Sequence, residues 1–162
     1  MKKGLLSALI CFMFCSCQNA LPININHFLD ESVTTAILEQ NDSKYIEGEF
    51  NTESHVVLGT IKNDNLITVY AMVLYLNYGY DNGDFKVVSG GHMPVALTFY
   101  ENKNNEYSLY EYWQPEDGEK YSSSIKSKFP KSIYEQALDT QKYIEQQQAE
   151  CDAKAQQYLI SK

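Results

Sequence analysis

The chain contains no arginine: its 13 basic residues are all lysines, against 21 aspartates and glutamates, and its formal net charge is −8. Arginine supplies the planar, bidentate donor group that suits phosphates and the edges of nucleic-acid bases. An acidic chain without arginine is poorly equipped to bind nucleic acid, or an anionic lipid surface, through charge. We therefore expect no nucleic-acid partner.

The sequence also lacks the short motifs on which several enzyme classes depend. It has no glycine-rich phosphate loop, no paired Cys-x-x-Cys and no His-Glu-x-x-His, and it contains only three histidines. These motifs hold nucleotides, structural zinc and catalytic zinc, respectively. Their absence predicts a protein without a cofactor.

Three of the four cysteines lie near the N-terminus. Lys2 and Lys3 precede an apolar run over residues 5–14, which is too short to span a bilayer, and Ser16-Cys17 follows this run. This order is typical of a bacterial lipoprotein signal peptide at residues 1–16, with lipid attached to Cys17. Ordinary secretion with cleavage nearby is the alternative. Diacylglyceryl and N-acyl (palmitate) chains would together anchor the protein to the outer face of the cytoplasmic membrane.

The rest of the chain is expected to form one domain. Residues 17–26 are a short polar tether, and residues 27–162 hold enough apolar side chains for one core, since 44% of the sequence is hydrophobic. Once the signal peptide is removed and Cys17 carries lipid, Cys151 is the last free thiol, so no internal disulfide can form. Cohesion must come from packing.

The apolar pattern predicts an α+β fold. A short helix over residues 29–40, capped at Asn26, precedes an antiparallel β-meander of about five strands. The strand ranges are 45–62 (interrupted near Asn51), 66–78, 85–89, 92–100 and 107–113. The second is apolar on both alternating sets of positions and should lie centrally, covered on both faces.

Turn residues set the boundaries of these strands. Asn82-Gly83 predicts a type I′ hairpin, and Gly90-Gly91 predicts a sharp reversal or a bulge between the third and fourth strands. Pro94 should lie at a strand start or a sheet edge, because it has no N–H to donate. A short helix with a serine cap is expected over residues 122–129. Pro130 would then open one long helix, which packs against the sheet and ends near Leu159.

Two small groups of residues suggest catalysis or metal binding. Glu53 and His55 share a strand face, and His92 on another strand would complete a metal site if the strands brought it near. Ser89 and His92 are the other pair, as nucleophile and base. No nucleophile elbow surrounds Ser89, however, and a serine before two glycines is typical of a turn. Structural roles are the simpler interpretation of both groups. Cys151 is expected to be a small buried hydrophobic residue and not a catalytic thiol.

An aromatic cluster gives a different candidate site. Four rings lie close together in the sequence near acidic residues: Tyr110, Tyr112, Trp113 and Tyr121. They are a candidate binding patch for an amphipathic ligand or partner, held by ring contacts and cation–π attraction. The alternative, which we favour, is that these rings close the end of the sheet against the terminal helix, with Trp113 as the buried anchor.

Three blocks of sequence carry a resemblance to a known family. They are Ser89-Gly90-Gly91-His92-Met93-Pro94, the block from Tyr110 to Gly118, and Ser124-Ile125-Lys126-Ser127-Lys128-Phe129-Pro130. They resemble the extracytoplasmic C-terminal domain of Firmicutes membrane metallopeptidases of the β-lactam sensor-transducer type, a domain that also occurs as free-standing lipoproteins. The likeness covers residues 53–158. It implies an extracytoplasmic location but no known chemistry.

The activities of those sensor proteins do not transfer with the resemblance. The zinc peptidase motif is absent here. Ser123 and Lys126 match the spacing of a serine-acylation motif, but neither Ser-Asp-Asn nor Lys-Thr-Gly follows. We expect a lipid-anchored extracytoplasmic binding or sensory module, without catalysis, for an unknown small-molecule or protein ligand. The alternative is a small extracytoplasmic hydrolase or metal-dependent enzyme that uses Ser89 and His92, or Glu53, His55 and His92.

Overall fold

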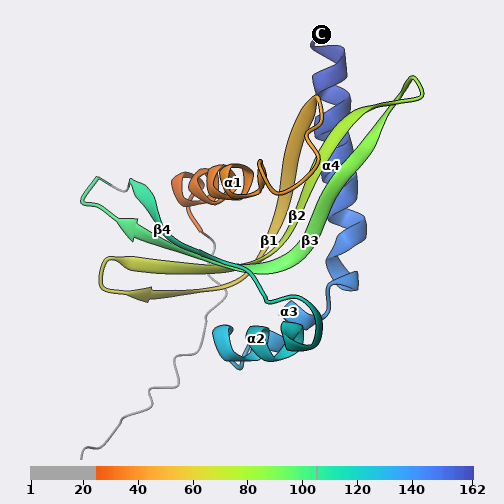
Figure 1. Cartoon of the computed structure of the whole chain (residues 1–162). Helices are drawn as coiled ribbons and strands as arrows, with labels where there is room; N and C mark the ends of the chain where they lie inside the picture. Colours follow the sequence, from red (N-terminus) through yellow and green to blue (C-terminus); the bar gives the residue numbers. More distant parts are fainter. Residues whose placement is uncertain (1–24, 105) are drawn as a thin grey trace, which may run out of the picture.

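A computed structural model describes residues 25–104 and 106–162. Cys17, the predicted site of lipid attachment, and the predicted signal peptide lie outside the described residues. The elements follow in the order α1 (His27–Asn41), β1 (Phe50–Asn63), β2 (Leu66–Asp81), β3 (Asp84–Glu101), β4 (Tyr107–Trp113), the 3-10 turn η1 (Gly118–Lys120), α2 (Tyr121–Lys128), α3 (Tyr134–Leu138) and α4 (Gln141–Ile160) (Figure 1). Helices on an antiparallel sheet confirm the α+β class.

The sheet is a simple meander with the order β1-β2-β3-β4. It has four strands in place of the five expected, because Gly90-Gly91 does not reverse the chain. Both glycines lie inside β3, where Gly91 pairs with Tyr75 of β2. A Cβ atom on Gly91 would lie 2.1 Å from the hydroxyl oxygen of Tyr45. The glycine therefore serves close packing against Tyr45.

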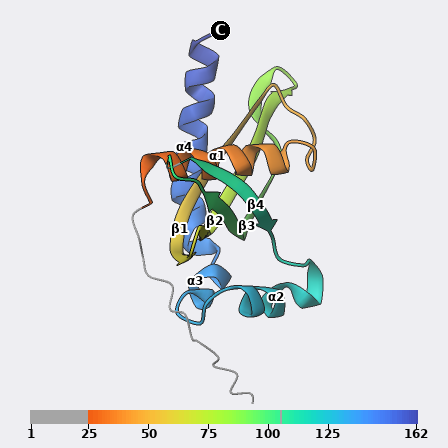
Figure 2. The same ribbon diagram turned by 90° about the vertical axis from the view of Figure 1, so that its left-hand side faces the viewer.

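β2 is the centre of the fold, as its two apolar faces predict. One set of its side chains, which includes Val69 and Val73, packs against α1. The alternate set, which includes Met72 and Leu74, packs against α2, α3 and α4 on the opposite face. The two views show this arrangement, with α1 on one side of a strongly bent sheet and the C-terminal helices on the other (Figures 1 and 2).

Three local predictions are confirmed. The side chain of Asn26 accepts a hydrogen bond from the backbone N–H of Leu29 and so caps α1, at 2.9 Å. Asn82 and Gly83 have φ angles of 54° and 90° between the paired residues Asp81 and Asp84, as a type I′ turn requires. Pro94 lies in β3 before its pairing with β4 begins at Ala96, so one side of the strand is an edge there.

The ends of some elements differ from the expected ones. β1 begins at Phe50, and Asn51 lies within it; residues 42–49 form a loop that crosses the sheet. The loop is held there by a hydrogen bond of 2.8 Å from the N–H of Glu49 to the carbonyl of Tyr78. The predicted serine cap is wrong as well, since α2 follows directly on η1 and has no side-chain cap.

The predicted long C-terminal helix is interrupted. α3 ends at Leu138 and α4 begins at Gln141, because Asp139 leaves the helical conformation with a ψ of 69°. The bend in the sheet explains the break. Ala137 packs beside Ile125 of α2 under one part of the sheet, whereas Cys151 packs under Leu74 and its neighbours. One straight helix would not follow both parts of this curved surface.

Candidate functional site

His55 is held between two carboxylates on the α1 face of the sheet. Its Nδ1 lies 3.0 Å from an oxygen of Glu53, two residues earlier on β1, and its Nε2 lies 3.1 Å from Asp30 of α1. Glu53 also accepts a hydrogen bond of 2.8 Å from the hydroxyl of Thr34 on α1. The side chains of Glu53 and His55 are 2% and 8% exposed. These contacts connect α1 to β1 through buried side chains: Asp30 and Thr34 on α1 bond to His55 and Glu53 on β1.

The charges in this group stabilise one another. Burial opposes ionisation of both residues, but the hydrogen bond and charge of Glu53, together with Asp30, outweigh it and raise the pKa of His55. In the same way, burial is outweighed at Glu53 by His55, Thr34 and Lys154, and its pKa is lowered. When protonated, the imidazole donates from both nitrogens to carboxylates, those of Glu53 and Asp30. It has no free lone pair with which to act as a base or bind a metal.

His92 lies on the other face of the sheet. It pairs with Leu74, which packs against α4, whereas His55 pairs with Val73, which packs against α1. The Glu53, His55 and His92 metal site is therefore not formed, and the residues that the structure describes contain no cluster of three or more potential ligands from His, Cys, Asp and Glu. The error came from assuming that two strands would present all three side chains to one face.

His92 instead belongs to a buried hydrogen-bond network centred on Gln147 of α4. Gln147 is fully buried, and its Oε1 lies 2.9 Å from Nε2 of His92. Its Nε2 donates to the backbone carbonyls of Ser54 and Met72 at 2.8 and 3.0 Å. Burial lowers the pKa of His92. A neutral His92 that donates to Gln147 fits this network and has a structural role.

Ser89 is not paired with His92. Its hydroxyl donates to the carbonyl of Ile46 at 2.5 Å and accepts from Asn77 at 3.2 Å, on the face of the sheet opposite His92. The serine therefore fastens the 42–49 loop to β3. Cys151 is fully buried, and burial raises the pKa of its thiol to about 12, so it is no nucleophile at neutral pH.

The aromatic candidate patch is divided between different surfaces. Tyr112 points toward α1, where its hydroxyl accepts a hydrogen bond of 3.1 Å from Asn41. Trp113 and Tyr121 pack on the opposite face of the sheet with the C-terminal helices. Tyr110 occupies a bulge of β4 and is 72% exposed. The four rings do not form one site, because adjacent residues of a strand point to opposite faces.

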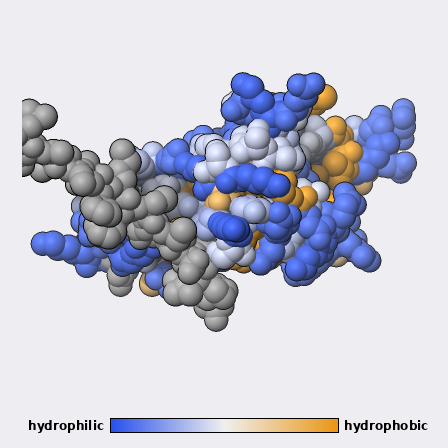
Figure 3. Space-filling model, turned by 90° about the horizontal axis from the view of Figure 1, so that it is seen from below, coloured by the Kyte–Doolittle hydropathy of each residue, from blue (hydrophilic) through white to orange (hydrophobic). Residues whose placement is uncertain are grey.

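The position of Trp113 supports the closure interpretation in part: the ring closes the sheet against the segment after α2 and not against the terminal helix, and it is half-buried, not a buried anchor. Its ring lies 5.8 Å from that of Phe129, centroid to centroid, and the Nζ of Lys128 lies 6.0 Å above it. Lys128 in turn pairs with Glu111 of β4 at 2.8 Å. Viewed from below, the visible surface around α2 is mainly hydrophilic, with small separate apolar areas (Figure 3). Trp113 joins the end of the sheet to the segment after α2.

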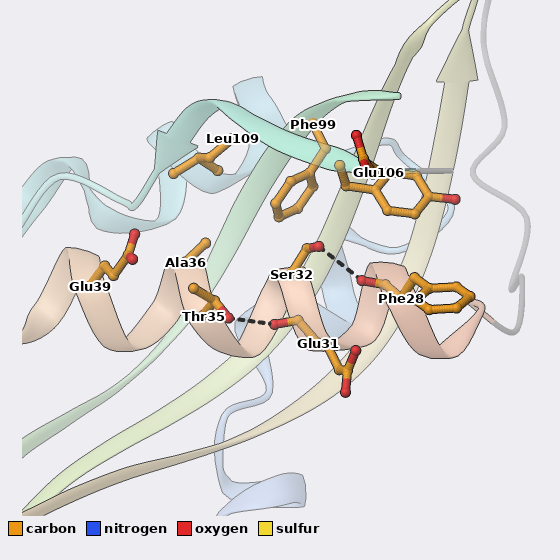
Figure 4. Close-up of a pocket in the computed structure, with 10 residues that line it drawn as sticks. Phe28, Glu31, Ser32, Thr35, Ala36, Glu39, Phe99, Glu106 and Leu109 are labelled. Atoms are coloured by element: carbon orange, nitrogen blue, oxygen red, sulfur yellow. Dashed lines mark hydrogen bonds between the residues drawn. The ribbon is translucent and has the colours of Figure 1, made fainter. Parts of the chain in front are cut away.

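An open groove with a volume of about 410 Å³ lies between α1 and β4. Its floor is apolar, made by Ala36, Phe99 and Leu109, and the exposed ring of Phe28 stands at one end. The close-up shows Phe99 and Leu109 directed toward α1 (Figure 4). Phe99 and Ala36 are themselves buried, at 1% and 3% exposure, so the apolar surface open to a ligand is mainly that of Leu109 and Phe28.

Carboxylates dominate the polar part of this groove. Its lining includes Glu31, Glu39 and Glu106 and, within the described residues, no lysine. The hydroxyls of Ser32 and Thr35 donate back to α1 carbonyls at 2.8 and 2.9 Å, so neither is poised to attack a substrate (Figure 4). The combination of apolar side chains and carboxylates suits an amphipathic, positively charged ligand.

Sequence reasoning missed this groove and also missed Asp30, Thr34 and Gln147. The groove joins a helix and an edge strand that lie far apart in the chain, so no local motif marks it. One sequence signal existed: Phe28, Glu31, Thr35 and Glu39 share the outer face of the predicted helix. A single exposed phenylalanine is common on protein surfaces, so this signal alone did not mark a site.

Comparison with known proteins adds no assignment. No family model, curated protein or solved structure matches the chain. The resemblance to the C-terminal domain of sensor-transducer peptidases therefore stays a prediction. Across the described residues, no helix has both the length and the apolar character needed to cross a membrane.

Proposed function

We propose that this chain is a lipid-anchored binding or sensory module on the outer face of the bacterial cytoplasmic membrane, and that its ligand binds in the groove between α1 and β4. The observation that carries the proposal is the combination, in one groove, of an apolar floor, an exposed aromatic ring and three carboxylates. Ligand sites typically combine apolar walls with a few polar groups. The catalytic alternatives lack comparable support, because their side chains do not converge.

The lining also favours one kind of ligand. Positive charge on the ligand would meet Glu31, Glu39 and Glu106, and an apolar part would cover Phe28 and the floor. The α1 wall from Phe28 to Glu39 is about 16 Å long at 1.5 Å per residue. An extended segment of about five residues has that length. The ligand we propose is therefore an amphipathic cation, either a small molecule or a short basic segment of a partner protein.

The lipid anchor rests on the N-terminal sequence. Lys2-Lys3, the short apolar run and the small Ser16 before Cys17 have the order of a lipoprotein signal peptide. The two kinds of hydrocarbon chain attached at such a cysteine give membrane binding that one chain alone does not. Residues 18–26 would then connect the membrane to the start of α1.

The anchor is tested by Cys17→Ser. We expect this variant to leave the membrane fraction for the culture fluid, or to remain as the unprocessed precursor, because serine cannot accept the thioether-linked lipid. Fractionation and mass spectrometry of the N-terminus measure both outcomes. Cys15→Ser is the matched control and should behave as the wild type. Normal processing and full membrane retention of Cys17→Ser would contradict the lipid anchor.

The groove is tested with a fluorescein-labelled pentapeptide of alternating lysine and leucine, measured by fluorescence anisotropy. We expect Glu39→Lys to weaken its binding by at least three- to fivefold, because the change removes one exposed charge contact and adds a charge that repels the peptide. A peptide with glutamate in place of lysine should bind much more weakly. Glu145→Lys changes the net charge equally at an exposed position of α4 outside the groove, so it is the control. Equal weakening by both variants would show that overall charge, and not the groove, attracts the peptide.

A further inference from the structure

The first half of β3 is an open edge of the sheet. β3 pairs with β2 along its length, but β4 pairs with it only from Ala96 onward. Among the described residues, no backbone hydrogen bond joins the other side of Asp84–Val95 to a further segment. In Figure 1 this half of β3 runs up to the β2–β3 turn, away from β4. An open edge of this kind is a template on which another strand can pair.

Only part of this edge carries the features that usually prevent such pairing. Near its start, Lys86 is charged and Val88 has no partner in β2, which marks a bulge. Charges and bulges both protect sheet edges. The run from Ser89 to Met93 has neither, since it pairs with β2 residue by residue and contains no Asp, Glu or Lys. Burial lowers the pKa of His92 within it, which favours the neutral form.

Exposed apolar side chains lie beside this edge on both faces of the sheet. On the α4 face, Val87 is 39% exposed next to its partner Tyr78, and an open groove of about 330 Å³ lies along the edge. On the α1 face, Ile46 of the 42–49 loop is 73% exposed, and its carbonyl accepts the hydrogen bond from Ser89. Because the side chains of a strand alternate between faces, an added strand would cover both residues.

The run from Ser89 to Met93 is complementary in size to a second copy of itself. In an antiparallel pair centred on Gly91, Met93 of each copy would lie opposite Ser89 of the other, on the α1 face. His92 would lie opposite Gly90 on the α4 face. Each large side chain would therefore meet a small one, and the centre of the pair would carry no side chain.

The symmetry and the charge of such a pair also suit this chain. Two antiparallel strands of one sheet are related by a two-fold axis perpendicular to the sheet, so both copies keep α1 on the same face. Both N-terminal ends of α1 would then lie on one side of the joined sheet, as suits two chains anchored to one membrane. Each chain is acidic, with a formal net charge of −8, but the copies would meet along an uncharged run.

We propose that two copies of this chain pair through the open edge of β3, antiparallel and centred on Gly91, and so join their four-stranded sheets into one. The interface is the run from Ser89 to Met93, with Val87 and Ile46 beside it. No residue of this edge lines the acidic groove between α1 and β4. The inference therefore does not depend on the proposed function.

Paired cysteines test the register. Cells co-express two differently tagged full-length chains, one with Ser89→Cys and one with Met93→Cys, and are treated with a thiol oxidant. We expect a disulfide-linked dimer that carries both tags, because residues paired across antiparallel strands have Cβ atoms about 4.5–5.5 Å apart. Two copies of Ser89→Cys should link far less, since these positions would be about 13 Å apart along the strands. Wild-type chains give the background, in which Cys151 is buried.

Val87→Lys tests the edge itself, because a charge on an edge strand opposes pairing. Added to both cysteine chains, it should reduce the linked dimer at least about fivefold. Tyr110→Lys is the matched control: Tyr110 is 72% exposed on β4, outside the proposed interface, and its replacement should leave the yield unchanged. Thermal unfolding of each variant checks that the fold is retained.

Sedimentation of the purified full chain gives a readout without added cysteines. The wild type should form dimers whose fraction falls on dilution, and Val87→Lys should be mainly monomeric. Equal linking of the matched and the mismatched cysteine pairs, as random collision would produce, would overturn the proposal. So would a wild-type chain that sediments as a monomer at every concentration, or a dimer that Val87→Lys and Tyr110→Lys affect alike.

Discussion

Replacing His55 with alanine is expected to lower the free energy of unfolding by about 3–5 kcal/mol, the typical cost of breaking a buried ion pair by removing one partner. The imidazole is the only cation that contacts the buried carboxylate of Glu53 through a side-chain bond in the described residues. Its removal leaves that carboxylate beside apolar neighbours with only the hydroxyl of Thr34 as a side-chain donor. It also releases Asp30 of α1. Urea unfolding followed by circular dichroism measures the loss.

The pH dependence gives the same prediction a second readout. Glu53 has a lowered pKa in the folded chain, so its contribution is complete above the ordinary carboxyl pKa of about 4.3 and is lost as the pH falls through the lowered value. His55 has a raised pKa, so its contribution is complete below about pH 6.5 and is lost as the pH rises through the raised value. The stability difference between the wild type and His55→Ala should therefore be largest near pH 5–6.

His27 is the matched control for this prediction. It forms a similar contact of 3.1 Å with Glu31, but its side chain is 76% exposed. His27→Ala should change the unfolding free energy by less than about 0.5 kcal/mol, because solvent screens exposed ion pairs. An equal effect of the two alanine variants, or a difference at His55 that does not vary with pH, would show that the buried pair does not stabilise α1 against the sheet.

Gln147→Leu is expected to produce the second large loss, about 2–4 kcal/mol. Leucine has nearly the same volume as glutamine but provides none of the three hydrogen bonds, so His92 and the carbonyls of Ser54 and Met72 lose their partner on α4. Each buried polar group left without a partner costs about 1–3 kcal/mol, and relaxation of the site offsets part of the sum. Thermal or urea unfolding measures this loss.

The chain itself supplies the control for Gln147. Gln146, the preceding residue, is exposed, and its side chain donates a hydrogen bond of 2.9 Å to Glu150 of the same helix. Gln146→Leu should change stability by less than about 0.5 kcal/mol. If the two leucine variants unfold alike, the hydrogen bonds of Gln147 contribute no net stability, and its burial reflects packing alone.

These three consecutive glutamines show where sequence reasoning stops. Gln146, Gln147 and Gln148 are chemically identical, and only the position of α4 on the bent sheet decides that the middle one is fully buried. By contrast, β2 and the Asn82-Gly83 turn were predictable from local sequence. β2 is apolar at both alternating sets of positions, which indicates a strand covered on both faces. The type I′ turn needs positive φ angles, which Asn and Gly adopt readily. Gly90-Gly91 was misread because its close contacts are with residues distant in sequence: a Cβ atom on Gly90 would meet the backbone oxygen of Tyr75, and one on Gly91 the hydroxyl of Tyr45.

Some residues of the candidate site could likewise be predicted from the sequence, and others could not. The sequence identified Glu53 and His55 as neighbours because both lie on one strand with the period of two. It did not identify Asp30 or Thr34, because the helix that carries them reaches β1 only through the tertiary fold. The groove between α1 and β4 is also a surface between elements, and no spacing within one element marks it.

The order of contacts along the chain has a consequence for how the protein folds. Each pair of neighbouring strands is also adjacent in sequence, so the meander can form early from local contacts. The face that carries Leu74, Leu76 and Tyr78 is covered only by α4, whose side chains reach back about 100 residues, as the bond from Tyr158 to the carbonyl of Glu49 illustrates. Until the last helix docks, the half-formed sheet exposes that apolar face. We therefore expect a chain truncated before α4 to aggregate and not to form a smaller stable domain.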